Sequence, residues 1–224
     1  MQLWGRGALA LALIGSVGLA QGYEAGDILV RAGAATVSPR VDSDAFSVAP
    51  LTGAKVDVNN DTQFGFTVAY MINSRFGVEL LAATPFKHDL YVEGAGLGRT
   101  DIGDTKHLPP TLMAQYYLPE LGPVRPYVGL GVNYTYFFDE NIHDGVVSPL
   151  IGGANADVSL SNSVGWAAQV GVDLAMGDTW FVNLSAWRVD IDTEARLKVN
   201  GSTVDKIDVE LDPLVWMVGI GRAF

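Results

Sequence analysis

The stretch "YVGLGVNYTY", residues 127–136, decides the fold class of this chain. From Val128 to Tyr136 every second residue is large and apolar or aromatic, and glycine, asparagine and threonine fill the positions between them. A period of two places alternate side chains on opposite faces of a β-strand, so one face meets an apolar medium. The glycines indicate little room on the other face, as inside a narrow barrel. They do not form a phosphate-binding loop, because no helix is expected after them.

The same alternation recurs along the chain and predicts eight strands. Their expected ranges are 26–37, 61–72, 75–90, 105–118, 124–138, 163–175, 179–191 and 206–224. Tight connections at 73–74, 119–123 and 177–178 alternate with long ones at 38–60, 91–104, 139–162 and 192–205. Short turns on one side and long loops on the other are typical of outer-membrane barrels. The prediction is an all-β fold: a single domain, 21–224, forming an eight-stranded antiparallel up-and-down transmembrane β-barrel with both termini in the periplasm.

Composition supports a membrane barrel and argues against other classes. Hydrophobic residues make up 49% of the chain, yet after the first twenty residues no apolar run approaches the ~18 of a spanning helix. Residues 1–20 combine one cation, an apolar run and the small residues Gly18 and Ala20, as in a secretory signal peptide. We therefore expect export to the outer membrane of a Gram-negative bacterium.

The charged and metal-binding residue types exclude several partners. The net charge of −11 and the lack of a basic stripe argue against nucleic acid. Cysteine is absent and histidine occurs three times, so we expect no disulfide, no metal site and no cofactor. His88 and His107 lie near the loop ends of neighbouring strands and are expected to face each other, which is too few ligands for a metal. Acidic loop runs such as Asp190, Asp192 and Glu194 suit divalent cations, but solvated loop charge is the favoured interpretation.

Aromatic residues gather at both ends of the expected strands, as in interfacial bands. The band at the tight-turn end comprises Tyr70, Phe76, Tyr116, Tyr117, Tyr127, Trp180 and Phe224, and that at the loop end Tyr134, Tyr136, Phe138 and Trp216. A soluble lipocalin-like barrel is the alternative, but its interior would be apolar. Here the inward positions are polar in the lower barrel and predict a hydrogen-bonded plug. The expected plug residues are Arg31, Glu79, Gln115, Asn133, Gln169 and Asp173. A catalytic cluster is the less favoured interpretation of the same groups.

Several segments resemble the outer membrane protein W (OmpW) family. They are "YEAGDILVRAGAATVSP", "FGVELLAATPFKH", "KHLPPTLMAQYY", "RPYVGLGVNYT", "WRVDIDTEA" and the "LDPLVW" near the end, in family order over nearly every strand. The resemblance implies an outer-membrane barrel with a narrow apolar path that opens sideways and admits small hydrophobic molecules. It also places an apolar gate pair on Leu81 and Trp187. Parity independently turns both inward, and Val189 and Ile191 continue the face of Trp187 as an apolar funnel. Ordinary core packing of Leu81 and Trp187 remains the alternative.

Two adjacent prolines interrupt the fourth expected strand. Pro109 and Pro110 lack the N–H groups that a sheet ladder needs, and in lipid an unpaired backbone group costs several kcal/mol. We interpret them as a local opening of the wall beside the strand that carries Leu81. The alternative is that the strand simply begins at Thr111.

Three functions are compatible with the sequence. The favoured one is a passive outer-membrane channel for small hydrophobic solutes, with lateral exit into the membrane. The second is a structural or adhesion barrel whose loops bind host, phage or lipopolysaccharide. The third, a lipid-modifying enzyme, ranks last because no inward serine–histidine pair is evident. The expected partners are outer-membrane lipid, lipopolysaccharide and hydrophobic solutes, with the protein as a monomer.

Overall fold

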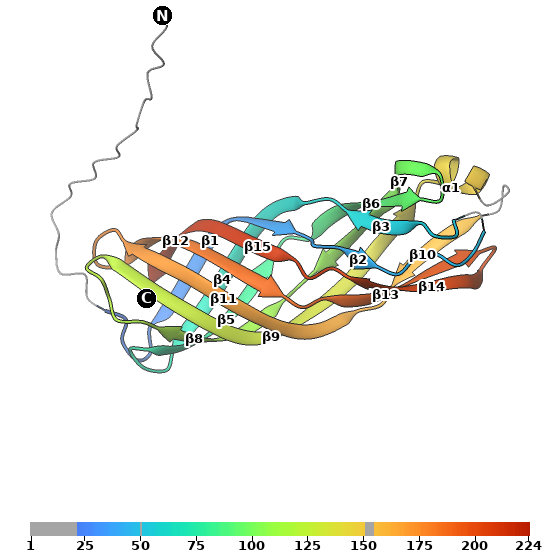
Figure 1. Cartoon of the computed structure of the whole chain (residues 1–224). Coiled ribbons are helices and arrows are strands. Elements are labelled where there is room, and N and C mark those ends of the chain that lie inside the picture. The colour runs from blue at the N-terminus through green and yellow to red at the C-terminus, as the bar shows by residue number, and fades with distance from the viewer. Residues whose placement is uncertain (1–21, 50, 151–154) are drawn as a thin grey trace, which may run out of the picture.

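A computed structural model describes residues 22–49, 51–150 and 155–224, and they form a long, narrow barrel (Figure 1). The expected signal peptide, 1–20, lies outside the described residues. The barrel strands are β1 (Ile28–Ser38), β4 (Asp61–Met71), β5 (Phe76–Ala83), β8 (Thr111–Tyr117), β9 (Val124–Ile142), β11 (Ser163–Ala175), β12 (Trp180–Val189) and β15 (Leu214–Ala223). Each pairs antiparallel with its neighbours in the order β11-β12-β15-β1-β4-β5-β8-β9, and β9 pairs with β11. The ring is therefore closed, as the alternating pattern predicted.

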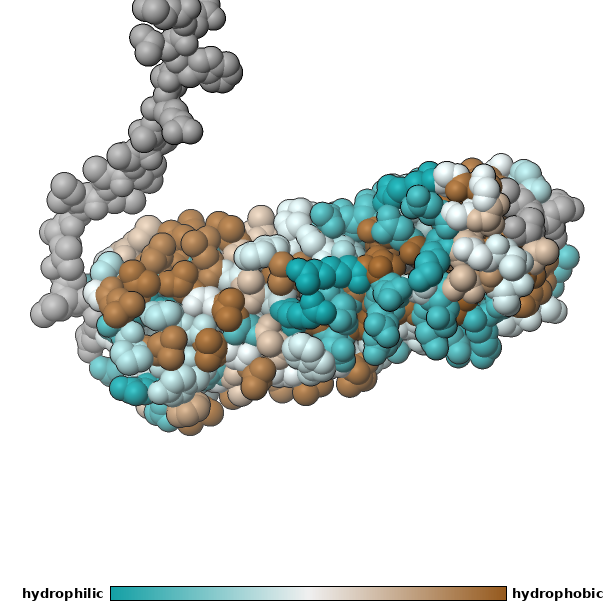
Figure 2. Space-filling view, in the orientation of Figure 1, coloured by the Kyte–Doolittle hydropathy of each residue, from teal (hydrophilic) through white to brown (hydrophobic). Residues whose placement is uncertain are grey.

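The outer face of the barrel is an apolar belt. Leu130, Val164 and Val170 are 70%, 72% and 59% exposed on that face. On a strand that faces water, positions this exposed are usually polar. In Figure 2 the brown surface gathers over the barrel half, and the outer half carries more teal. Tyr70, Phe76, Trp180 and Phe224 at one end, and Tyr134, Tyr136 and Trp216 toward the other, are exposed as expected of interfacial bands. Tyr117 and Tyr127 were wrongly assigned to a band: both are buried and point into the lumen.

The expected long loops are largely strands, which corrects the sequence-based boundaries. Two sheets continue the barrel on its far side, one in the order β9-β7-β6-β3 and the other β10-β13-β14-β2. Their added strands are β2 (Asp42–Ser43), β3 (Lys55–Val58), β6 (Phe86–Gly94), β7 (Leu97–Leu108), β10 (Ala156–Leu160), β13 (Asp192–Val199) and β14 (Ser202–Glu210). Leu108 pairs with Tyr136, a residue of the outer aromatic band, so the rest of β7 lies beyond that band.

These outer strands form because they have a second apolar core to cover. Leu90, Val92, Leu197, Ile207 and Val209 are buried together between the two sheets. Several glycines that suggested loops, such as Gly96 and Gly201, occupy the tight turns between these strands at positive φ. The single helix of the described residues, α1 (Asp144–Leu150), is short, and no helix among them is long and apolar enough to cross a membrane.

Candidate functional site

The lower lumen is closed by one buried cation between two buried carboxylates. Arg31 on β1 donates from Nη1 to Glu79 Oε2 at 2.8 Å and from Nη2 to Asp173 Oδ2 at 2.7 Å. A further bond joins Arg31 Nε to Asp173 Oδ1 at 3.1 Å, so the guanidinium grips Asp173 with two nitrogens. All three side chains are at most 1% exposed. Buried charges of this kind persist only when paired and fully hydrogen-bonded.

Amide and phenol groups complete the plug. Gln169 Nε2 donates to Glu79 Oε1 at 2.9 Å, and Gln115 Nε2 donates to Gln169 Oε1 at 3.0 Å. The Tyr117 hydroxyl donates to Gln115 Oε1 at 2.9 Å and accepts from Arg31 Nη2 at 2.8 Å. Five of the six expected plug residues thus meet in one network: Arg31, Glu79, Gln115, Gln169 and Asp173.

Asn133, the sixth expected plug residue, serves another part of the lumen. Its Nδ2 donates to the Thr111 hydroxyl at 2.9 Å and to the Pro109 carbonyl at 3.2 Å, with Pro110 O at 3.4 Å. Thr135 donates to its Oδ1 at 2.7 Å. Asn133 is therefore fully buried against the double proline rather than within the plug.

An apolar layer covers the plug. Leu81, Met113, Trp187 and Met217 belong to one buried cluster together with Val189, and each is at most 6% exposed. Trp187 pairs across strands with Gln169, so this layer lies directly on the amide groups of the plug. All the residues expected to line the gate and funnel, including Ile191, belong to this cluster. The Trp187 Nε1 donor has no hydrogen-bond partner among the described residues.

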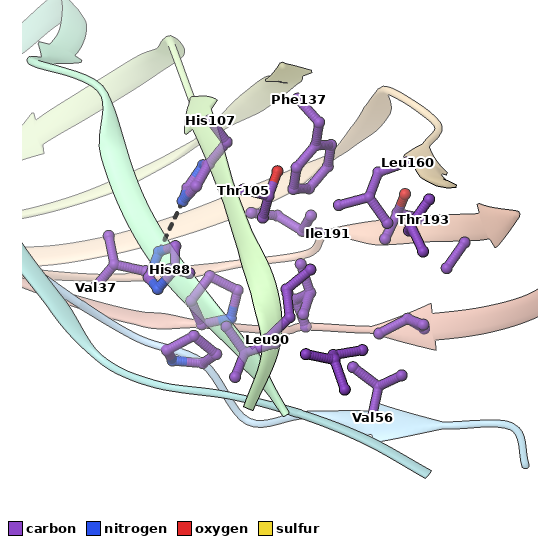
Figure 3. Close-up of a pocket in the computed structure, with 18 of the residues that line it drawn as sticks. Val37, Val56, His88, Leu90, Thr105, His107, Phe137, Leu160, Ile191 and Thr193 are labelled. Atoms are coloured by element: carbon purple, nitrogen blue, oxygen red, sulfur yellow. Dashed lines mark hydrogen bonds between the residues drawn. The ribbon is translucent and has the colours of Figure 1, made fainter. Parts of the chain in front are cut away.

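Above this layer lie two adjoining apolar cavities. The smaller has about 410 Å³ of empty space, which includes open solvent, and touches Leu81, Ala83, Pro109, Val189 and Ile191. The larger has about 780 Å³ of such space between the two outer sheets, and Figure 3 shows its lining. Val37, His107, Ile191 and Pro213 border both cavities, so the two adjoin at these side chains. We call the smaller one the gate cavity and the larger one the outer chamber.

The gate cavity reaches a break in the barrel wall. The β5–β8 ladder ends at Leu81 with Thr111, and the β6–β7 ladder begins at Phe86 with His107. Between these pairs no backbone hydrogen bond joins residues 82–85 to 108–110, within the part of the chain that the structure describes. Ala82, which has the outward parity and pairs with Phe66, nevertheless lines the cavity. The gate cavity therefore borders this unpaired stretch of the wall.

The break is one-sided. Toward β9 the ladder continues across the prolines, because Tyr134 N donates to Pro110 O at 3.0 Å. Pro213 lies between β14 and β15 and leaves no comparable break. Val189 N donates to Pro213 O at 3.2 Å, and Leu211 bonds both Ile191 and Arg40 through its backbone.

The histidine pair expected from the sequence is present. His88 Nε2 and His107 Nε2 lie 3.0 Å apart, and both rings are buried at the wall of the outer chamber (Figure 3). Sequence reasoning missed most of the chamber's other lining, including Val56, Val158 and Leu160, because these residues were assigned to loops. Their alternating apolar pattern was the available signal.

An acidic cluster forms where the chain passes from β12 to β13 and from β14 to β15. Ligand oxygens of Asp190, Asp192 and Asp212 lie within 4.8 Å of one another. Asp212 also accepts from Arg188 Nη2 at 2.8 Å. Partial burial and the charges of Asp190 and Asp212 raise the pKa of Asp192. The sequence had grouped Asp190 and Asp192 with Glu194, which instead pairs with Arg196 and Lys206.

Comparison with known proteins defines the family. The sequence model of the OmpW family matches residues 24–224. The chain belongs to the OmpW family. Outer membrane protein W of Vibrio cholerae is 44% identical over 207 residues, covering 90% of each chain.

More distant relatives and a solved structure extend this result. The crystal structure of OprG from Pseudomonas aeruginosa superimposes with a TM-score of 0.80 at 40% identity, covering 92% of this chain and 99% of that one. The dibenzothiophene metabolism operon protein PahQ of Pseudomonas aeruginosa is 32% identical over 173 residues, covering 77% of this chain and 76% of that one. The closed barrel and these relatives identify a Gram-negative outer-membrane protein, and the family matches the resemblance seen in the sequence.

Proposed function

We propose that this OmpW-family barrel is a passive channel through which small hydrophobic molecules enter the outer chamber, pass the gate cavity and leave sideways into the membrane. The observation that supports the proposal is the position of the gate cavity, which adjoins the chamber and borders the unpaired wall segment beside Pro109. No cofactor and no energy source enter the proposal, because a concentration gradient suffices to drive the solute.

The polar plug supports a lateral rather than a downward exit. A solute that continued downward would have to displace the bonds among Arg31, Glu79 and Asp173 and leave buried charges unpaired. An apolar solute gains roughly 0.8 kcal/mol per CH₂ in an apolar environment, so the chamber and the lipid both favour it over the lower lumen. The route of least cost therefore runs through the wall.

The relatives are consistent with an apolar solute. PahQ is named for an operon of dibenzothiophene metabolism, and dibenzothiophene is an apolar aromatic heterocycle. We propose Leu81 and Trp187 as the gate, because both belong to the apolar layer between the cavities and the plug. In this proposal Val189 and Ile191 line the funnel, and Pro109 and Pro110 edge the exit.

Filling the gate cavity tests the proposal. Ala83 lines that cavity, so a tryptophan side chain at this position would fill the proposed route. Ala83→Trp should therefore slow uptake of an apolar fluorescent dye into proteoliposomes by about tenfold or more. Ala114→Trp is the matched control, because Ala114 lies on the exposed outer face of β8 and should leave uptake unchanged. Uptake that is equal in wild type and Ala83→Trp would overturn the channel and favour an adhesion role for the outer sheets.

A further inference from the structure

The hydrogen bonds of the histidine pair fix the positions of its protons. His88 Nδ1 lies 2.7 Å from the carbonyl oxygen of Asn59, and a carbonyl only accepts, so His88 Nδ1 carries a proton. In a neutral imidazole the other nitrogen is then a bare acceptor. His107 Nε2, at 3.0 Å from His88 Nε2, must therefore be the protonated donor of that contact. The remaining nitrogen, His107 Nδ1, is left as an unprotonated acceptor.

Burial keeps both rings neutral. His88 and His107 are 3% and 4% exposed, and the His107 ring stacks on Phe86 and lies tilted against Phe137, with ring centres 5.5 and 5.7 Å away. This apolar setting lowers the pKa of both histidines, that of His107 to about 3. Both lie on the outer strands β6 and β7, beyond the outer aromatic band. The tautomers just assigned are therefore those of neutral pH.

Two polar atoms of this wall have no protein partner. His107 Nδ1 and the Thr105 hydroxyl are both buried without a hydrogen bond among the described residues. The two residues stand two apart on β7, so both face the outer chamber, and His107 also borders the gate cavity. Buried acceptors are nearly always satisfied, so an unpartnered one in a cavity wall indicates a ligand group.

We propose that His107 Nδ1, assisted by the Thr105 hydroxyl, is a polar subsite that selects apolar solutes carrying one hydrogen-bond donor, an aromatic N–H or a hydroxyl. The inference rests on the proposed channel function and specifies its solute class. The apolar lining accepts the ring system, and the acceptor orients the donor at the point where the chamber meets the gate cavity. A solute without a donor enters the same space but leaves Nδ1 unsatisfied. Such a solute is bound less tightly than one with a donor, because the buried Nδ1 has lost its hydrogen bond to water and gains none in its place.

Indole and 1-benzothiophene provide a matched pair of probes, because the two bicyclic rings are similar in size and only indole has an N–H. The uptake rate of each probe into proteoliposomes gives an indole-to-benzothiophene rate ratio for the wild type and for each variant. Dividing a variant's ratio by the wild-type ratio cancels the different partitioning of the two probes into the membrane. His107→Phe keeps an aromatic ring in contact with Phe86 and Phe137 but removes the acceptor. We expect it to lower the ratio about two- to tenfold, the range of a hydrogen bond between neutral groups.

Thr193→Val is the control variant. Thr193 lines the same chamber, but its hydroxyl already donates to Ser161 O at 2.7 Å, so its loss removes no free polar atom. The ratio should stay at the wild-type value. A ratio unchanged in His107→Phe, with both probes still transported, would overturn the subsite and leave the channel standing.

A measurement on the wild-type protein covers the case in which His107→Phe does not fold or neither probe is transported. Histidine ¹⁵N NMR in lipid bilayers should show His107 as the Nε2–H tautomer, and indole but not benzothiophene should shift its Nδ1 resonance. Such a shift without transport would support the subsite while the channel proposal fails. An Nδ1–H tautomer, or equal responses to the two probes, would overturn the subsite.

Discussion

The two halves of the lumen treat buried polar groups in opposite ways, and different strands line them: the barrel strands line the lower half, and outer strands such as β6, β7 and β13 supply much of the upper lining. In the lower half Arg31, Glu79 and Asp173 are buried, and every one of them has charged or amide partners within 3.1 Å. In the upper half the walls are apolar. Two of the buried polar atoms there, His107 Nδ1 and the Thr105 hydroxyl, have no hydrogen-bond partner among the described residues. The lower half is a sealed, mutually satisfied network, whereas the upper half has space and unmet bonding capacity. The polar network and the apolar cavities thus lie at different levels of the same barrel.

Removing the central cation should break the lower half most severely. Arg31→Met leaves Glu79 and Asp173 buried without their shared partner, and they must either stay charged or take up protons. We expect a loss of about 3–5 kcal/mol in the free energy of unfolding, measured by urea titration in lipid. Lys55→Met is the control, since Lys55 and Asp42 form an exposed pair, 56% and 80% exposed, whose loss should matter little. Equal effects of the two substitutions would show that the plug is not a distinct energetic unit.

Truncating a side chain of the apolar layer above the plug should both destabilise the barrel and widen the proposed gate. Leu81 is 6% exposed and packs in the layer above the plug, so Leu81→Ala should cost about 2–4 kcal/mol through the cavity it leaves. It should also speed dye uptake, because the proposed gate becomes wider. Leu80→Ala, on the exposed outer face of the same strand, should leave uptake unchanged. Slower or unchanged uptake in Leu81→Ala would count against a gate at this residue.

Sequence alone anticipated the lower half better than the upper half, for a physical reason. Alternation assigns each side chain to one face, so Arg31, Glu79 and Asp173 were placed inward without knowledge of any contact. Tyr117 was misplaced although it shares the parity of Gln115, because its aromatic character was given more weight than its position. The outer chamber was missed because Gly- and Asp-rich segments near Val56 and Val158 read as loops. The one-sidedness of the break at Pro109 and Pro110 depends on which neighbour supplies a donor, and no local pattern encodes that.

Acidification should affect the upper half alone, and by the smallest amount. The pKa of His88 and His107 is lowered by burial, so the closed chamber keeps them neutral while an opened one protonates them near the ordinary value of 6.5. The opened state then binds more protons, so the stability of the closed chamber is complete well above pH 6.5 and falls as the pH drops through that value. Between pH 7 and pH 6 the expected loss is roughly 0.7 kcal/mol for His107, and His88 adds to it in the same direction. Amide exchange in β6 and β7, corrected for intrinsic rates, should report it, and β1, which carries no histidine, is the internal control. Opening that is independent of pH in β6 and β7, or equal changes in β1, would mean that the histidine pair does not distinguish the two halves.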